Sequence, residues 1–113
     1  MILDALRSQL IQAQKANDTL RVSVLRYFLS AIKNKEIELR PQKLELNDEV
    51  IFKVLRKQMK QRRESIEEYK KGNRQDLVDK ETAELGVLGE IEKMFPPEII
   101  QKEDARRQAG PRE

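Results

Sequence analysis

The centre of the chain carries a dense run of basic side chains, and such charges can bind phosphate groups. Residues 53–74 contain nine basic and three acidic side chains, so this segment has a formal charge of +6. Three of the basic residues are spaced at i, i+4 and i+7, which predicts one face of a helix (Arg56, Lys60 and Arg63). This ridge is suited to follow the backbone of an RNA. The candidate RNA-binding residues are Lys53, Arg56, Lys57, Lys60, Arg63, Lys70, Lys71 and Arg74.

The same ridge has a simpler interpretation as the solvated face of a helix. Polar, charged faces are usual on helices that bury their opposite face. No aromatic residue lies among the basic residues to stack on a base, because Tyr69 is in phase with the apolar positions of the segment. If the ridge binds RNA, we therefore expect recognition of shape and backbone charge, without reading of the base sequence.

Arg62 is placed differently from the other basic residues. It occupies the apolar phase of its helix between Leu55 and Ile66, where a solvated charge is not expected. A buried charge is stabilised by an ion pair. We therefore predict a structural salt bridge from Arg62 to an acid on a neighbouring helix, with Glu36 or Glu81 as the partner.

The constellations that usually support catalysis are missing from the sequence. Neither histidine nor cysteine occurs, which removes the commonest general base and every thiolate site. The serines lie in predicted helices without a histidine to activate them. Neither a GxGxxG nor a GK[ST] motif is present to bind phosphates through a glycine-rich loop.

Acidic residues one helical turn apart raise the possibility of a Mg²⁺ or di-acid site, as in Glu64 with Glu67 and Glu68, and Glu81 with Glu84. We favour a solvated face on which basic residues neutralise these acids. The sequence thus predicts no catalytic residue, no metal site and no cofactor. The neutralising pairs that it predicts are Lys60–Glu64 and Arg63–Glu67.

The composition predicts one domain of a soluble protein. The chain has 113 residues, of which 38% are charged and 38% hydrophobic. No apolar run approaches the roughly 18 residues of a membrane span. The opening MILDALRSQL is too short and too acidic for a signal or transit peptide. We therefore expect a cytoplasmic protein that does not contact a membrane.

Apolar residues at spacings of three and four predict an all-α, multihelical fold of about four helices packed as hairpins. Pro41 ends the second helix, and Gly72 is expected to end the third as a left-handed cap. Residues 101–113 have no apolar period and are expected to be disordered. The four predicted helices cover about residues 2–16, 18–38, 48–71 and 75–95.

Two blocks of the sequence resemble the signature blocks of the YqeY family. They are LRVSVLRYFLSAIKNKEIE (20–38) and RKQMKQRRESIEEYKKGNRQDLVDKETAE (56–84). The resemblance covers residues 1–100, which we interpret as a YqeY-like N-terminal helical domain. It implies a multihelical fold related to the C-terminal region of GatB, a subunit of the tRNA-dependent amidotransferase.

The resemblance also implies a function. It suggests a non-catalytic module that binds tRNA and assists tRNA-dependent amidotransferase subunits, in a family filed under carbon–nitrogen ligases with glutamine as amido-N-donor. The family usually continues after a Leu-Pro segment into a small tail domain, whereas this chain has MFPPE (94–98) and ends at Glu113. We expect that tail domain to be absent. The alternative is a protein–protein adaptor or homodimerising helical module with no RNA contact.

Overall fold

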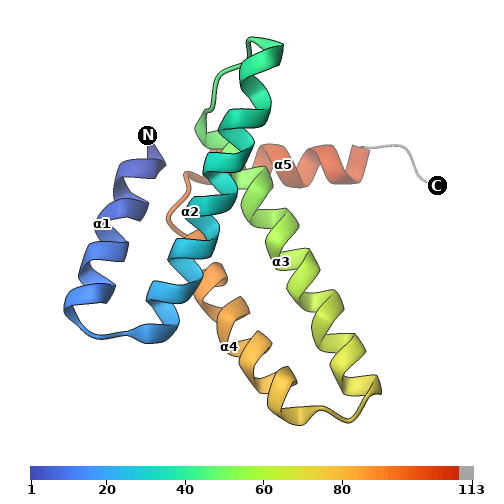
Figure 1. Cartoon of the computed structure of the whole chain (residues 1–113). Helices are drawn as coiled ribbons and strands as arrows, with labels where there is room; N and C mark the ends of the chain where they lie inside the picture. Colours follow the sequence, from blue (N-terminus) through green and yellow to red (C-terminus); the bar gives the residue numbers. More distant parts are fainter. Residues whose placement is uncertain (110–113) are drawn as a thin grey trace.

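Helices make up almost all of the chain that the structure describes, residues 1–109 (Figure 1). The structure is a computed structural model. These residues contain no strand, so the all-α class predicted from the sequence is confirmed, with one helix more than expected. The elements are α1 (Ile2–Lys15), α2 (Thr19–Leu39), the 3₁₀ helix η1 (Arg40–Gln42), α3 (Asp48–Lys71), α4 (Gln75–Glu92) and α5 (Pro97–Ala109).

Polar side chains define where α2 and α3 begin. Asp18 Oδ1 accepts a hydrogen bond from the backbone N–H of Arg21 at 3.1 Å, and Asn47 Oδ1 accepts one from that of Val50 at 2.9 Å. Such caps satisfy backbone donors that have no partner inside the helix. Asp48, at the start of α3, accepts the backbone N–H of Ile2 at 3.0 Å. The first turn of α1 is thereby tied to the first turn of α3.

The two turns that close the hairpins share one conformation. Asn17 ends the α1–α2 turn at φ 55°, and Asn73 ends the α3–α4 turn at φ 56°. The prediction that Gly72 would be the left-handed residue is wrong, since Gly72 has φ −86° and Asn73 follows it in the left-handed region. Asparagine tolerates this region because its short polar side chain bonds locally.

The helices pack as two hairpins, α1 with α2 and α3 with α4, and α2 crosses against α3 and α4 (Figure 1). One hydrophobic core lies where they meet. In residues 1–109 no helix is both long and apolar enough to span a membrane. The buried cluster consists of Leu6, Ala13, Val24, Leu25, Phe28, Ile32, Ile51, Phe52, Leu55, Met59, Val87, Leu88, Ile91 and Phe95.

A helix replaces the disorder expected after residue 100. Residues 101–109 continue α5, which packs across the N-terminal half of α3. Ile99 packs against the core, and Lys102 Nζ lies 3.1 Å from Glu49 Oε1 on α3. These long-range contacts stabilise a segment whose own sequence lacks an amphipathic pattern. The expectation for residues 110–113 lies outside the described residues.

An aromatic pair holds the connection from α4 to α5. The rings of Phe52 and Phe95 meet edge to face with centroids 5.0 Å apart, and both side chains are buried. Pro97 opens α5, where its fixed φ and missing N–H suit the first position of a helix.

We predict that Phe95→Ala lowers the free energy of unfolding by about 3–5 kcal/mol, because it leaves a cavity against Phe52. Urea unfolding followed by circular dichroism measures the loss. Tyr27→Ala is the matched control, since this aromatic side chain is 61% exposed and its removal should cost less than about 1 kcal/mol. Equal losses in the two variants would contradict the packing described for Phe95.

Candidate functional site

The outward face of α3 carries four exposed basic side chains. Lys53, Lys57, Lys60 and Arg63 point away from the core, as their spacing predicts. Within the described residues none of the four has a carboxylate oxygen within 4.0 Å. We call these four residues the α3 cationic face. Its charges are available to an external anion, since no acid of this part of the chain neutralises them directly.

The acids farther along α3 pair differently from the prediction. Glu67 Oε1 lies 3.6 Å from Lys70 Nζ, and Glu68 Oε1 lies 3.7 Å from Lys71 Nζ. The predicted pairs of Lys60 with Glu64 and Arg63 with Glu67 do not form in the structure. Lys70 and Lys71 are therefore partly neutralised, and they stand apart from the α3 cationic face by one acidic turn.

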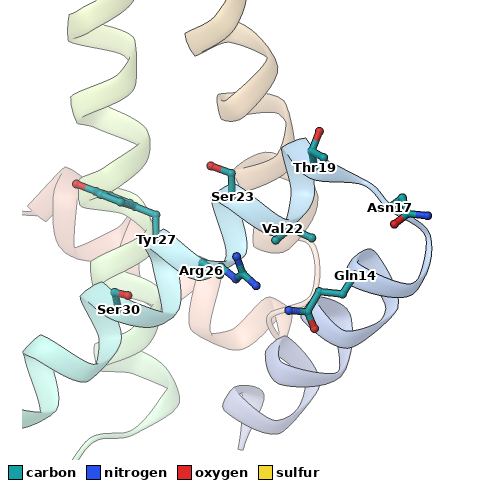
Figure 2. A pocket seen from close by; sticks show the side chains of 8 residues that line it. All are labelled: Gln14, Asn17, Thr19, Val22, Ser23, Arg26, Tyr27 and Ser30. Atoms are coloured by element: carbon teal, nitrogen blue, oxygen red, sulfur yellow. The ribbon is translucent and has the colours of Figure 1, made fainter.

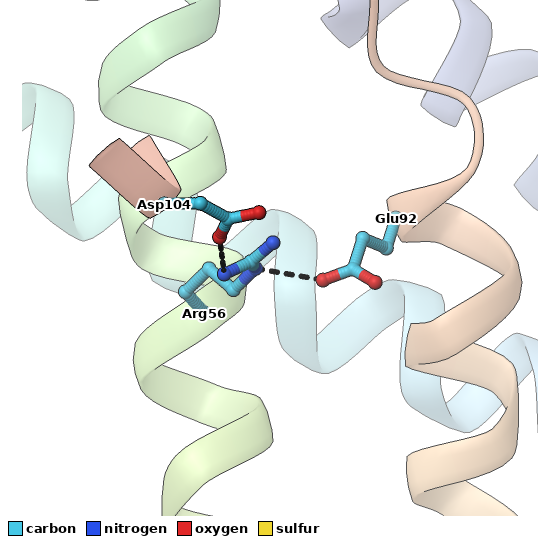
Figure 3. A network of polar contacts seen from close by, with 3 residues as sticks. All are labelled: Arg56, Glu92 and Asp104. Atoms are coloured by element: carbon cyan, nitrogen blue, oxygen red, sulfur yellow. Dashed lines mark hydrogen bonds and ion pairs between the residues drawn. The ribbon is translucent and has the colours of Figure 1, made fainter. Parts of the chain in front are cut away.

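Arg56 links three helices, α3, α4 and α5, and does not belong to the α3 cationic face (Figure 3). Its Nε donates to Glu92 Oε2 on α4 at 2.7 Å, and its Nη1 donates to Asp104 Oδ1 on α5 at 2.8 Å. The guanidinium also lies over the ring of Phe52, 4.7 Å from its centroid. The expectation that Arg56 shares one solvent face with Lys60 is therefore corrected.

The electrostatics of Arg56 agree with this structural role. Burial lowers the pKa of Arg56, but the hydrogen bond to Asp104 and the charges of Glu92 and Asp104 outweigh it, so that the pKa is raised overall. The side chain is 17% exposed. Its charge is thus paired with two carboxylates of the protein, and an external phosphate would have to compete with them.

Arg74, the last of the predicted RNA-binding residues, is held at the start of α4. Its Nε and Nη2 donate to the two carboxylate oxygens of Asp76 at 3.2 and 3.1 Å. This hydrogen bond raises the pKa of Arg74 and lowers the pKa of Asp76. Both side chains are exposed, and the pair reduces the positive charge at this end of the hairpin.

Arg106 on α5 adds a basic residue that the sequence did not assign to the site. It lines a small hollow together with Lys53, and the acids Glu49 and Glu103 line the same hollow, so the charge there is mixed. The sequence offered no signal for this contact, because the segment was expected to be disordered and its position depends on packing against α3.

The Arg62 side chain points towards the protein interior, as its position on the apolar face of the helix predicts. Its Nη1 lies 2.7 Å from Glu81 Oε2 and 3.2 Å from Glu84 Oε2, both on α4. Glu36, the other candidate partner, instead accepts a hydrogen bond from Lys33 at 3.0 Å within α2, and this bond lowers the pKa of Glu36. The sequence indicated Glu81 as a candidate and missed Glu84.

A polar cleft of about 410 Å³ opens beside this ion pair, between α2, α3 and α4. Gln58 lines it and is 6% exposed, yet within the described part of the chain its Oε1 accepts no hydrogen bond, and Arg62 Nε likewise has no partner there. A buried polar atom left unpaired costs about 1–3 kcal/mol. The residues that line the cleft are Ser23, Tyr27, Gln58, Gln61, Arg62, Ser65, Lys80, Glu81 and Glu84.

Tyr27 separates this cleft from a second hollow. The second hollow is a groove of about 650 Å³ along α1 and α2, where Arg26 and Gln14 face each other (Figure 2). Tyr27 and Ser23 line both hollows, and the Arg62 guanidinium lies 5.8 Å from the centroid of the Tyr27 ring. Tyr27 is out of phase with the apolar stripe of α2, and this signal could have identified it as an exposed aromatic.

The chemistry available at these sites is binding through charge, hydrogen bonds and one aromatic ring. Among residues 1–109 no group of three or more acidic side chains is arranged to hold a metal ion. Ser23 and Ser65 face the cleft, where carboxylates and amides can position a ligand.

Comparison with known proteins identifies a family and several relatives that this chain matches. A family model described as "Yqey-like protein" matches residues 3–108. The chain is 38% identical over 102 residues to "Altered inheritance of mitochondria protein 41, mitochondrial" of Kluyveromyces lactis, which covers 90% of this chain and 54% of that protein. It is 40% identical over 83 residues to the proteins of the same name from Vanderwaltozyma polyspora and Lachancea thermotolerans, covering 74% of this chain and 44% and 43% of theirs.

Two consequences follow from these relatives. The chain spans about half the length of the curated relatives it matches. Their names also overturn the cytoplasmic location expected from the sequence, because every one of these relatives is named as a mitochondrial protein. That expectation depended on the lack of a long apolar run and on the composition of the first ten residues.

We predict that Arg62→Met lowers the free energy of unfolding by about 3 kcal/mol, because the half-buried carboxylates of Glu81 and Glu84 lose the partner that they share. Urea unfolding measures the loss. Adding Glu81→Gln and Glu84→Gln should restore part of the stability, since the uncompensated charges are then gone. Lys60→Met is the control for loss of an exposed cation on the same helix and should change the value by less than about 0.5 kcal/mol.

We predict that Arg74→Gln raises the pKa of Asp76 towards its ordinary value, because the side-chain hydrogen bond that lowers it is removed. A lowered carboxyl pKa stabilises the folded state above the unfolded pKa, and this contribution disappears as pH falls through the folded pKa. Carboxyl NMR titration gives the pKa directly. Glu36 is the internal control, since its lowered pKa depends on Lys33 and should not move.

Proposed function

The chain belongs to the Yqey-like protein family, and from this premise we propose that it is a helical binding module that contacts tRNA through the α3 cationic face. The module has no catalytic role in this proposal and contributes a surface to a larger process. The observation that carries the proposal is the set of exposed basic residues on α3 without carboxylate partners in the described part of the chain.

The physical basis is the release of counterions from a polyanion. Each lysine or arginine that neutralises a phosphate frees a condensed counterion, so unpaired cations contribute more than cations already held by acids. Lys53, Lys57 and Lys60 lie on successive turns of one helix face, which gives a line of charge along the helix axis. Such a line suits a phosphate backbone and has no means of reading base sequence.

The larger process in this proposal is tRNA-dependent amidation. The signature blocks at 20–38 and 56–84 resemble those of proteins related to the GatB subunit, and this resemblance supports an accessory role beside amidotransferase subunits. Glutamine-dependent carbon–nitrogen ligation would then belong to those subunits. The names of the yeast relatives support mitochondria as the compartment of action.

A second candidate function is that of a protein–protein adaptor. Ile11, Leu20, Tyr27 and Ile37 are large hydrophobic residues that α1 and α2 leave exposed. Exposed apolar surface of this kind favours contact with another protein or a second copy of the chain. Sedimentation of the purified protein without RNA tests the homodimerising form of this candidate, because the RNA-binding module predicts no self-association there.

We predict that the purified chain binds tRNA and that Lys57→Gln/Lys60→Gln weakens this binding. Affinity is measured by fluorescence anisotropy between about 50 and 300 mM salt, where the logarithm of the affinity should fall linearly with the logarithm of the salt concentration. The double variant should reduce the slope by about 1 for each lysine removed.

The matched control is Lys15→Gln/Lys43→Gln, which removes two exposed lysines away from α3. It should retain the slope of the unaltered chain. Absence of tRNA binding at the lowest salt concentration, or the same loss in both double variants, would overturn the assignment to the α3 cationic face.

A further inference from the structure

The cleft between α2, α3 and α4 has the features of a built polar site. Gln58 and Arg62 lie one turn apart on α3 and both line the cleft, and each has one buried polar atom without a hydrogen-bond partner among residues 1–109. One of these atoms is an acceptor, Gln58 Oε1, and the other is a donor, Arg62 Nε. Buried polar atoms are paired in the great majority of cases, so an unpaired acceptor and donor beside one cleft point to a ligand that offers both.

The charges of the cleft favour a neutral ligand. Arg62 and Lys80 contribute two positive charges, and Glu81 and Glu84 contribute two negative charges. A free phosphate would meet both carboxylates, and an organic cation would meet Arg62. A neutral molecule with several hydrogen-bonding groups avoids both repulsions, and the hydroxyl and amide groups of the lining are suited to it.

Tyr27 provides a flat surface at the edge of the cleft. The ring is exposed on α2, and the Arg62 guanidinium lies 5.8 Å from its centroid. Aromatic rings and guanidinium planes are the surfaces on which unstacked bases pack. The space beside them, about 410 Å³, is within the range of small-molecule sites.

We propose that this cleft binds one unpaired nucleobase that carries an exocyclic amino group. The base stacks on Tyr27, and its amino group donates to the carboxylates of Glu81 or Glu84 or to the carboxamide of Gln58. Carboxylates accept from such amino groups, whereas uracil has none to donate. Adenine, cytosine and guanine therefore bind more tightly than uracil.

This inference rests on the proposed function, because that function supplies the RNA from which the base comes. Gln61 lines the cleft and lies one helical turn after Lys57, which belongs to the α3 cationic face. Phosphates that follow this face pass close to the mouth of the cleft. An RNA strand is thus the favoured source, and a free nucleoside offers the same chemistry without the phosphates.

The test compares short homo-oligonucleotides of adenosine, cytidine and uridine with the free nucleosides, using the full chain. Quenching of tyrosine fluorescence and NMR chemical shifts report binding. We expect the adenosine and cytidine oligonucleotides to bind about tenfold more tightly than the uridine oligonucleotide. Tyr27→Ala should weaken their binding by about tenfold or more and remove the preference, whereas Tyr27→Phe should retain both. Ile37→Ala is the matched control, an exposed hydrophobic residue of α2 outside the cleft.

The outcomes separate this inference from the proposed function. Salt-dependent binding of all oligonucleotides with no preference and no effect of Tyr27→Ala overturns the base site and leaves the RNA-binding proposal standing. Binding of free adenosine and cytidine that depends on Tyr27, with no binding of RNA, supports the cleft and overturns the RNA-binding proposal. Absence of binding in both arms overturns both.

Discussion

The packing of α3 against three other helices is the constraint on which the rest of the structure depends. α3 packs against α2, α4 and α5, and its first residue, Asp48, also accepts the backbone N–H of Ile2 in α1. The apolar stripe along the 24 residues of α3 therefore packs against several neighbouring helices. Two arginines of α3 lie against these neighbours, Arg56 beside α5 and Arg62 beside α2, and each links α3 to acids of α4.

Both arginines use the same physical properties of the guanidinium group. The planar group donates several hydrogen bonds in fixed directions and also lies against an aromatic ring, Phe52 for Arg56 and Tyr27 for Arg62. Acids from distant parts of the chain satisfy the charges, so these arginines fasten the helices to one another. The positive charge that remains at the surface of α3 is carried mainly by lysines, whose compact, hydrated ammonium groups suit contact with phosphates.

The two candidate binding features lie on adjoining sides of the same helix. The α3 cationic face can attract a polyanion at long range, because its charges are solvated and unpaired. The cleft beside Gln58 has balanced charge, so the base binding that we propose there would depend on short-range stacking and hydrogen bonds. Under the two proposals, one compact helical unit combines general attraction of an RNA with local selection of a base.

Much of the fold could be predicted because its signals are local. The caps at Asp18 and Asn47, the apolar stripes and the inward phase of Arg62 all depend on residues within a few turns of one another. The left-handed residue at Asn73 escaped prediction, since Gly72 and Asn73 can both adopt that conformation and the geometry of the turn selects between them. The spacing of the apolar residues places Tyr27 outside the apolar stripe of α2, but it does not predict that Tyr27 lies beside Arg62.

Only the tertiary structure decided the partners of Arg56 and the choice of Glu81 over Glu36 for Arg62. Arg56 meets Glu92 and Asp104, which lie 36 and 48 positions away, and no spacing rule within a helix relates them. The same contacts hold α5, whose sequence has too weak an amphipathic pattern to predict a helix. The sequence by itself determined which faces of the helices are apolar and which are charged. Which charges pair and which stay free depended on how those faces meet, because ion pairs between helices arise from chain segments that only the folded core brings together.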